Sequence, residues 1–118
     1  MVQSLAFAQA CVIATPSGPC GRVSHCEGMI VAEAGWDLVQ RDLRAAPFNF
    51  DLNTALEVGA RLFFTGSALV TNWYQCTAGT AGCPATGGYL NLLAADDDNG
   101  NIVDGTPHMT AIFNAFNR

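Results

Sequence analysis

The chain contains no lysine, and its basic side chains are five arginines among 118 residues. Ten acidic residues give a formal net charge of −5. A protein with this balance offers no basic patch to nucleic-acid phosphates or to an anionic lipid surface. No apolar run approaches the ~20 uninterrupted residues that cross a bilayer. We therefore expect neither a nucleic-acid partner nor a membrane span.

A C-x-x-C pair is also absent, so we do not expect a structural zinc knot. Five cysteines are nevertheless present in this short chain. So many thiols are typical of an oxidising compartment, and we interpret the protein as secreted. The apolar residues 5–14 are not preceded by Lys or Arg, so they do not resemble a signal peptide. An export signal would lie upstream of Met1.

The cysteine spacing suggests two short disulfide loops. Cys76 and Cys83 flank a loop of small residues and are predicted to pair. Cys11 and Cys20 flank a loop that contains two prolines and could pair, with Cys26 as a competing partner. One cysteine is left over, which suggests that its partner lies outside this chain.

The apolar periodicity predicts an all-α fold, a small disulfide-stapled bundle of about four helices in a single domain, residues 1–118. Half of the residues are apolar, enough for a buried core. No alternating pattern typical of strands is present. Residues 2–10 are expected to be the end of a helix or a short packed segment. The main helices are expected from about Ser24 to Arg44, from Asp51 or Asn53 to about Trp73, over residues 89–95, and from Thr106 onwards.

The same periodicity predicts one buried face on each of three helices. These faces comprise Met29, Ala32, Trp36, Val39 and Leu43 in the first, widened by Ile30, Ala34 and Leu38, then Leu52, Leu56, Ala60, Phe63, Ser67 and Val70 in the second, and Met109, Ile112, Phe113 and Phe116 in the last.

The start of the first main helix carries the chemically interesting side chains. Ser24 and Glu27 have the S-x-x-E spacing of a capping box, which places His25 at the first helical position. A histidine in this position usually packs and forms one hydrogen bond. Cys26 lies where a thiolate would be stabilised, but adjacent helical residues do not face each other, so His25 is a poor base for it. A disulfide is the preferred interpretation of Cys26.

A cluster of acidic residues precedes the last helix. Asp96, Asp98, Asn101 and Asp104 fall at spacings that let oxygen ligands converge on a hard cation around Gly100. The alternative is a solvated loop whose Asp and Asn residues favour turns. We expect a calcium site, although no glutamate at the twelfth position completes an EF-hand. His108 is expected to cap or pack rather than to bind the metal.

Two segments resemble a known family. The pattern V-x-H-x-x-G-x-I in residues 23–30, followed by Trp36-Asp37-Leu38, and the segment 93–109 resemble the C-terminal helical subdomain of thermolysin-like zinc metallopeptidases, most closely the secreted bacterial relatives of fungalysin. The resemblance covers roughly residue 20 to the end. The expected order of helices also fits that subdomain.

The resemblance implies a role for His25 in a secreted zinc endopeptidase. In the family, the matching histidine donates a hydrogen bond to the oxyanion that forms during peptide hydrolysis. The family's zinc ligands come from H-E-x-x-H and a further glutamate, none of which this chain contains. An aspartate that precedes the histidine by five residues in the family is replaced here by Cys20. The expected partners are therefore a peptide substrate and an N-terminal half that carries the zinc, without which the chain would be inactive.

A second hypothesis is a stand-alone, non-catalytic secreted module stabilised by calcium and disulfides. The two hypotheses differ in the surface that they require. A subdomain separated from its other half exposes large apolar faces, whereas a free-standing module does not.

Overall fold

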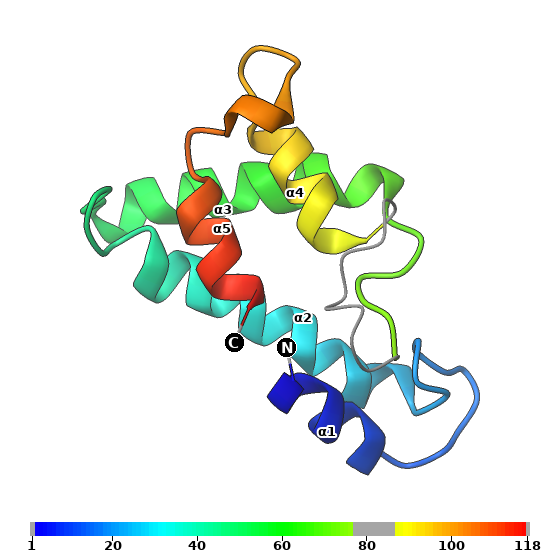
Figure 1. Cartoon of the computed structure of the whole chain (residues 1–118). Helices are drawn as coiled ribbons and strands as arrows, with labels where there is room; N and C mark the ends of the chain where they lie inside the picture. The colour runs from blue at the N-terminus through cyan, green and yellow to red at the C-terminus, as the bar shows by residue number, and fades with distance from the viewer. Residues whose placement is uncertain (1, 77–86, 118) are drawn as a thin grey trace.

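The protein is all-helical in the computed structural model, which describes residues 2–76 and 87–117 (Figure 1). The described residues form five α-helices: α1 (Val2–Ala10), α2 (Ser24–Asp37), α3 (Leu52–Gly66), α4 (Gly88–Asp96) and α5 (Met109–Phe116). The described residues form no β-sheet, and the loop between α1 and α2 contains two isolated β-bridges. The prediction of an all-α fold is confirmed. No helix in this part of the chain is long and apolar enough to span a bilayer.

Local signals set the helix boundaries well. α2 continues as a π-helix over Leu38–Asp42, so the helical segment ends close to the predicted Arg44. Asp51 caps α3 as expected, because its Oδ1 accepts a hydrogen bond from the backbone N–H of Thr54 at 2.9 Å. α3 and the following 3₁₀ turn end at Leu69, before the predicted Trp73.

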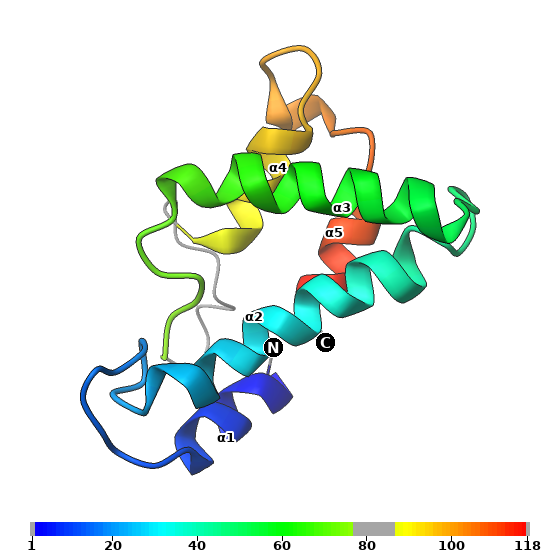
Figure 2. The same cartoon turned by 180° about the vertical axis from the view of Figure 1, so that it is seen from behind.

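The core lies where α2 and its π-helical end, α3, α4 and α5 meet. In Figures 1 and 2, α4 and α5 lie on one side of α3, and α1 lies beside the N-terminal part of α2. The buried apolar cluster comprises Ala34, Leu38, Leu43, Ala55, Leu62, Leu92, Leu93, Ala111, Ile112, Ala115 and Phe116. Most of these residues are aliphatic or small.

The buried face of α3 is not the one predicted from its large apolar residues. Ala55, Gly59, Leu62 and Gly66 are buried, whereas Leu52 and Leu56 are exposed. The small residues allow close approach: a methyl group added at Gly59 would overlap Val39, and one at Gly66 would press on α4. α3 therefore packs through its small residues, because close helix contact requires them, and leaves several large side chains outside.

The predicted faces of α2 and α5 are partly correct. Ala34, Leu38 and Leu43 are buried as predicted, but Met29 and Trp36 are 57% and 63% exposed. In α5, Ile112 and Phe116 are buried as predicted, whereas Met109 and Phe113 are 41% and 48% exposed. The error has one cause in both helices: periodicity identifies an apolar stripe, but the number of available packing partners decides how much of it is covered.

Candidate functional site

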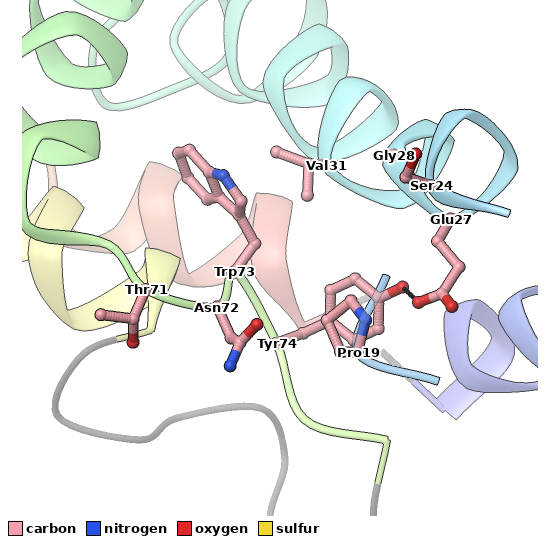
Figure 3. A pocket seen from close by; sticks show the side chains of 9 residues that line it. All are labelled: Pro19, Ser24, Glu27, Gly28, Val31, Thr71, Asn72, Trp73 and Tyr74. Atoms are coloured by element: carbon pink, nitrogen blue, oxygen red, sulfur yellow. Dashed lines mark hydrogen bonds between the residues drawn. The ribbon is translucent and has the colours of Figure 1, made fainter. Parts of the chain in front are cut away.

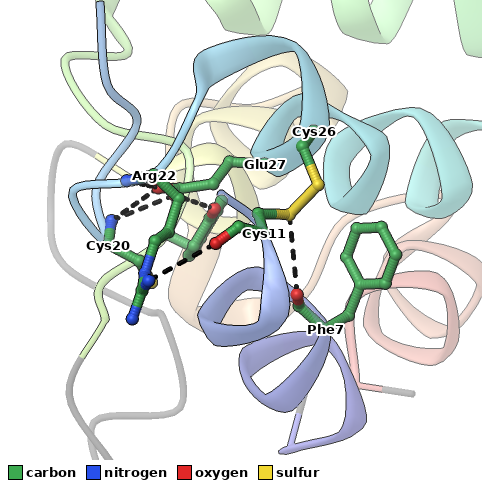
Figure 4. The surroundings of a disulfide bond; sticks show 7 residues. Phe7, Cys11, Cys20, Arg22, Cys26 and Glu27 are labelled. Carbon is green, nitrogen blue, oxygen red and sulfur yellow. Dashed lines mark hydrogen bonds between the residues drawn. A yellow bond between two sulfur atoms is a disulfide. The ribbon is translucent and has the colours of Figure 1, made fainter. Parts of the chain in front are cut away.

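Glu27 fixes the start of α2 to two other segments. Its side chain is almost fully buried, with 1% of the residue exposed. The carboxylate accepts hydrogen bonds from the backbone N–H groups of Cys20 (3.0 Å) and Arg22 (2.8 Å) (Figure 4). It also accepts one from the hydroxyl group of Tyr74 (Figure 3). One carboxylate thus joins α2, the preceding loop and the segment after α3.

The predicted capping box is therefore wrong. Val23 is the N-cap residue and makes no side-chain capping bond. The loop folds back before the helix, with Val23 N–H donating to Val12 C=O at 2.8 Å and Gly18 N–H donating to Arg22 C=O at 2.8 Å. This turn presents two N–H groups to Glu27, so the carboxylate bonds the loop instead of the N-cap residue. These contacts give Glu27 a structural role.

The pKa values of this buried pair shift in opposite directions. Burial raises the pKa of Glu27, but the hydrogen bonds from Tyr74, Cys20 and Arg22 and the charge of Arg22 outweigh it, so that the pKa is lowered from 4.5. Burial and the adjacent carboxylate raise the pKa of Tyr74 above its ordinary value of 10. The pair is therefore held as a carboxylate and a neutral phenol at neutral pH.

The disulfides differ from the two short-loop pairs, although Cys26, the competing partner that the spacing left open, does pair with Cys11. Cys11 is bonded to Cys26, with 6.0 Å between their Cα atoms, and Cys20 is bonded to Cys76, with 5.0 Å between theirs. Cys83 lies outside the described residues. The spacing argument favoured the nearest cysteines, but α1 lies beside the start of α2 and brings Cys11 to Cys26 (Figure 4). Cys26 is thus a disulfide cysteine and not a free nucleophile.

His25 projects from this fixed start of α2. It is the second residue of the helix, directly after Ser24, and it is exposed. Met29, Ala32 and Trp36 follow at the spacing of one helical face, and they too are exposed. α2 therefore carries an imidazole at the N-terminal end of an exposed apolar stripe, the α2 face, defined by these four residues.

A small pocket lies on the neighbouring side of the same helix. It has a volume of about 160 Å³ and lies between the first two turns of α2 and residues 71–74 (Figure 3). Val31 and Trp73 form its apolar wall, and the Tyr74–Glu27 hydrogen bond closes one end. Ser24 and Gly28 also line it. They occupy the same helical turn as His25, so the pocket and the imidazole share one end of α2.

The predicted calcium ligands are divided between two environments. Asp96 is buried and accepts hydrogen bonds from the hydroxyl group of Thr106 (2.7 Å) and the backbone N–H of His108 (2.6 Å), with the His108 Nδ1 atom at 2.7 Å. The other three predicted ligands, Asp98, Asn101 and Asp104, are exposed. No group of three or more His, Cys, Asp or Glu side chains in the described ranges is placed to hold a metal ion. The calcium site stays a prediction.

Sequence reasoning did not find the role of Asp96, which is to hold the start of α5. The last helix was predicted from Thr106 onwards, but α5 begins at Met109, after His108. The Thr106 hydroxyl group points to Asp96 instead. The His108 ring also lies against Phe48 and Phe50, with ring centroids 5.4 and 5.7 Å away. The expected packing role of His108 agrees with these contacts.

Replacing Asp96 with asparagine is expected to lower the free energy of unfolding by about 2 kcal/mol, because hydrogen bonds to a charged acceptor each contribute ~1.5–3 kcal/mol. Chemical denaturation measures the change. Asp98→Asn, in the exposed loop, is the matched control and should change stability by less than about 0.5 kcal/mol. Equal effects of the two substitutions would contradict a special role for Asp96.

Comparison with known proteins finds no match: no family model matches the chain, and neither does any curated protein or solved structure.

Proposed function

We propose that this chain is the C-terminal helical part of a secreted zinc-dependent endopeptidase and that His25 stabilises the oxyanion formed during peptide hydrolysis. The observation that carries the proposal is the α2 face. A polar, ionisable side chain stands at the end of an exposed apolar stripe on a helix whose start is held in place.

The attachment of α2 suits a side chain that must donate a hydrogen bond in a fixed direction. Cys26, the residue after His25, is joined by a disulfide to Cys11, which directly follows α1, and Glu27 is hydrogen-bonded to the preceding loop and to Tyr74. A rigid support reduces the reorganisation needed when charge develops on the substrate oxygen. In the proposed reaction, an N–H of the His25 imidazole donates to that oxygen and stabilises its negative charge.

The exposed apolar side chains of the α2 face support the proposal that another part of the parent protein covers this face. Met29 and Trp36 lie on the same face as His25 and are more than half exposed. Contiguous apolar surface rimmed by polar groups is typical of an interaction site. A zinc-bearing half that covered this stripe would bury it and would bring its substrate cleft to His25. These exposed side chains also favour the peptidase hypothesis over the stand-alone module.

The metal belongs to the proposed other part. Zinc would supply Lewis-acid chemistry at the peptide carbonyl. The described residues of this chain provide no group that fits zinc. This chain would contribute His25 and the covered α2 face, and the acidic loop at residues 96–104 remains the proposed calcium site.

The test is to read the source gene upstream of Met1 for H-E-x-x-H and a downstream glutamate in the same frame, and to express the full product. His25→Ala is expected to lower kcat for peptide hydrolysis by about two to three orders of magnitude, as removal of an oxyanion donor does. Zinc content and KM should change little, because the lost bond acts in the transition state.

Glu33→Gln is the matched control, because Glu33 is also exposed on α2 but lies outside the α2 face. It should leave kcat unchanged. A reading frame without H-E-x-x-H, or full activity of the His25→Ala variant, would contradict the proposal.

A further inference from the structure

α3 carries a second exposed apolar feature that the proposed function does not use. Leu52, Leu56, Ala60 and Phe64 recur every four residues and form a ridge along the helix, the α3 ridge. Phe64 is 85% exposed, and the other three members are also exposed. In Figure 2, α3 crosses in front of α4 and α5, and no other described helix lies over it. An apolar ridge of this length is typical of a contact surface.

Two opposite charges border the ridge. Glu57 and Arg61 are both exposed and lie one helical turn apart. Neither forms an ion pair within the described part of the chain. Both charges are therefore available to a partner.

We propose that the α3 ridge binds the α3 ridge of a second copy of this chain, with the two helices antiparallel about a two-fold axis. The start of each helix then lies opposite the end of the other. Leu52 faces Phe64 of the second copy, and Leu56 faces Ala60 of the second copy. Because Ala60 is small, it leaves space for Leu56 of the second copy. Such space is needed when two rows of side chains, each spaced every four residues along its helix, interdigitate.

The charges select this partner and this orientation. In the antiparallel pair, Glu57 of each copy lies beside Arg61 of the other, so one contact contains two opposite-charge pairs. In a parallel two-fold pair, the charged side chains of the two copies would lie on opposite edges of the contact, so these opposite-charge pairs would not form. A two-fold interface requires such a self-complementary pattern of apolar and charged groups. The α3 ridge has this pattern within a single helix.

The expected dimer is weak. A 15-residue helix is about 22 Å long, and one helix face buries less than the ~800 Å² per partner of a standard interface. We expect a dissociation constant on the order of ten micromolar, well within the concentration range of the test below. The proposal is independent of the proposed function, because the ridge shares no residue with the α2 face.

Sedimentation equilibrium of the 118-residue chain over about 1–300 μM tests the proposal. The wild type should show a monomer–dimer equilibrium. Phe64→Glu should weaken dimerisation by at least about a hundredfold, because it places a carboxylate in the apolar contact. Leu69→Glu, which adds the same charge at an exposed apolar position outside the ridge, should dimerise like the wild type. Circular dichroism checks that each variant is folded.

Charge reversal tests the orientation. Glu57→Arg and Arg61→Glu should each weaken the dimer, and the double variant should restore it, because the pairs are then reversed and complementary again. A monomeric wild type at the highest concentration would overturn the proposal. A dimer that survives Phe64→Glu but is lost in Trp36→Glu would also overturn it, since self-association would then use the α2 face.

Discussion

Replacing Glu27 with alanine is expected to lower the free energy of unfolding by about 4 kcal/mol. The substitution leaves the backbone N–H groups of Cys20 and Arg22 and the hydroxyl group of Tyr74 without their acceptor. Each buried polar group left unpaired costs about 1–3 kcal/mol, less where water enters. The loss of local stability should be greatest in the loop before α2 and around residue 74. Chemical denaturation gives the total, and amide hydrogen exchange locates it.

Two comparison variants separate the contribution of the Glu27 carboxylate to stability from the effect of substituting any residue in α2. Glu33→Ala makes the same change at an exposed position of α2 and should cost less than about 0.5 kcal/mol. Tyr74→Phe removes one of the three donors and should cost about 1–2 kcal/mol. A loss in Glu27→Ala no larger than in Glu33→Ala would show that the carboxylate does not hold these segments together.

The same pair sets the expected pH dependence of wild-type stability. Because folding lowers the pKa of Glu27, its contribution is present above pH 4.5 and is lost as the pH falls through the lowered value. Because folding raises the pKa of Tyr74, its contribution is present below pH 10 and is lost as the pH rises further. Stability should therefore fall at both extremes, and Glu27→Gln should reduce the fall on the acid side.

Removing the Cys20–Cys76 disulfide, in the double variant Cys20→Ser/Cys76→Ser, is expected to lower the free energy of unfolding by about 4 kcal/mol. The bond joins residues 56 positions apart, so its loss restores much conformational freedom to the unfolded chain. It also removes a tether next to the Tyr74–Glu27 contact. Cys11→Ser/Cys26→Ser, which opens a separation of 15 residues, should cost less, about 3 kcal/mol.

A tryptic digest without reduction checks the pairing itself. Cleavage after the arginines places Cys11 and Cys20 in residues 1–22, Cys26 in residues 23–41, and Cys76 in residues 62–118. The two disulfides of the structure join these three peptides into one covalent species, and reduction releases them. Three separate peptides before reduction would instead indicate the short-loop pairs, and would contradict the structure.

Sequence predicted the features that depend on neighbouring residues. The extent of α2 with its π-helical end followed from periodicity and from Pro47 after it, and Asp51 capped α3 because its carboxylate needs only the N–H of Thr54. The all-α class followed in the same way. His25 was located at the start of its helix from local pattern alone, and it lies there, exposed, within one residue of the predicted position.

Only the tertiary structure decided which groups meet across the chain. The groups that donate hydrogen bonds to Glu27 lie up to 47 residues away, so no local pattern distinguishes its contacts from a capping box. Three further features depend on contacts between separate segments and so were decided only by the tertiary structure. They are the pairing of Cys20 with Cys76, the buried face of α3 and the contact of Asp96 with Thr106. Helix formation depends on interactions over about four residues, whereas face, pairing and burial depend on long-range packing in which small residues such as Gly59 and Gly66 allow the closest approach.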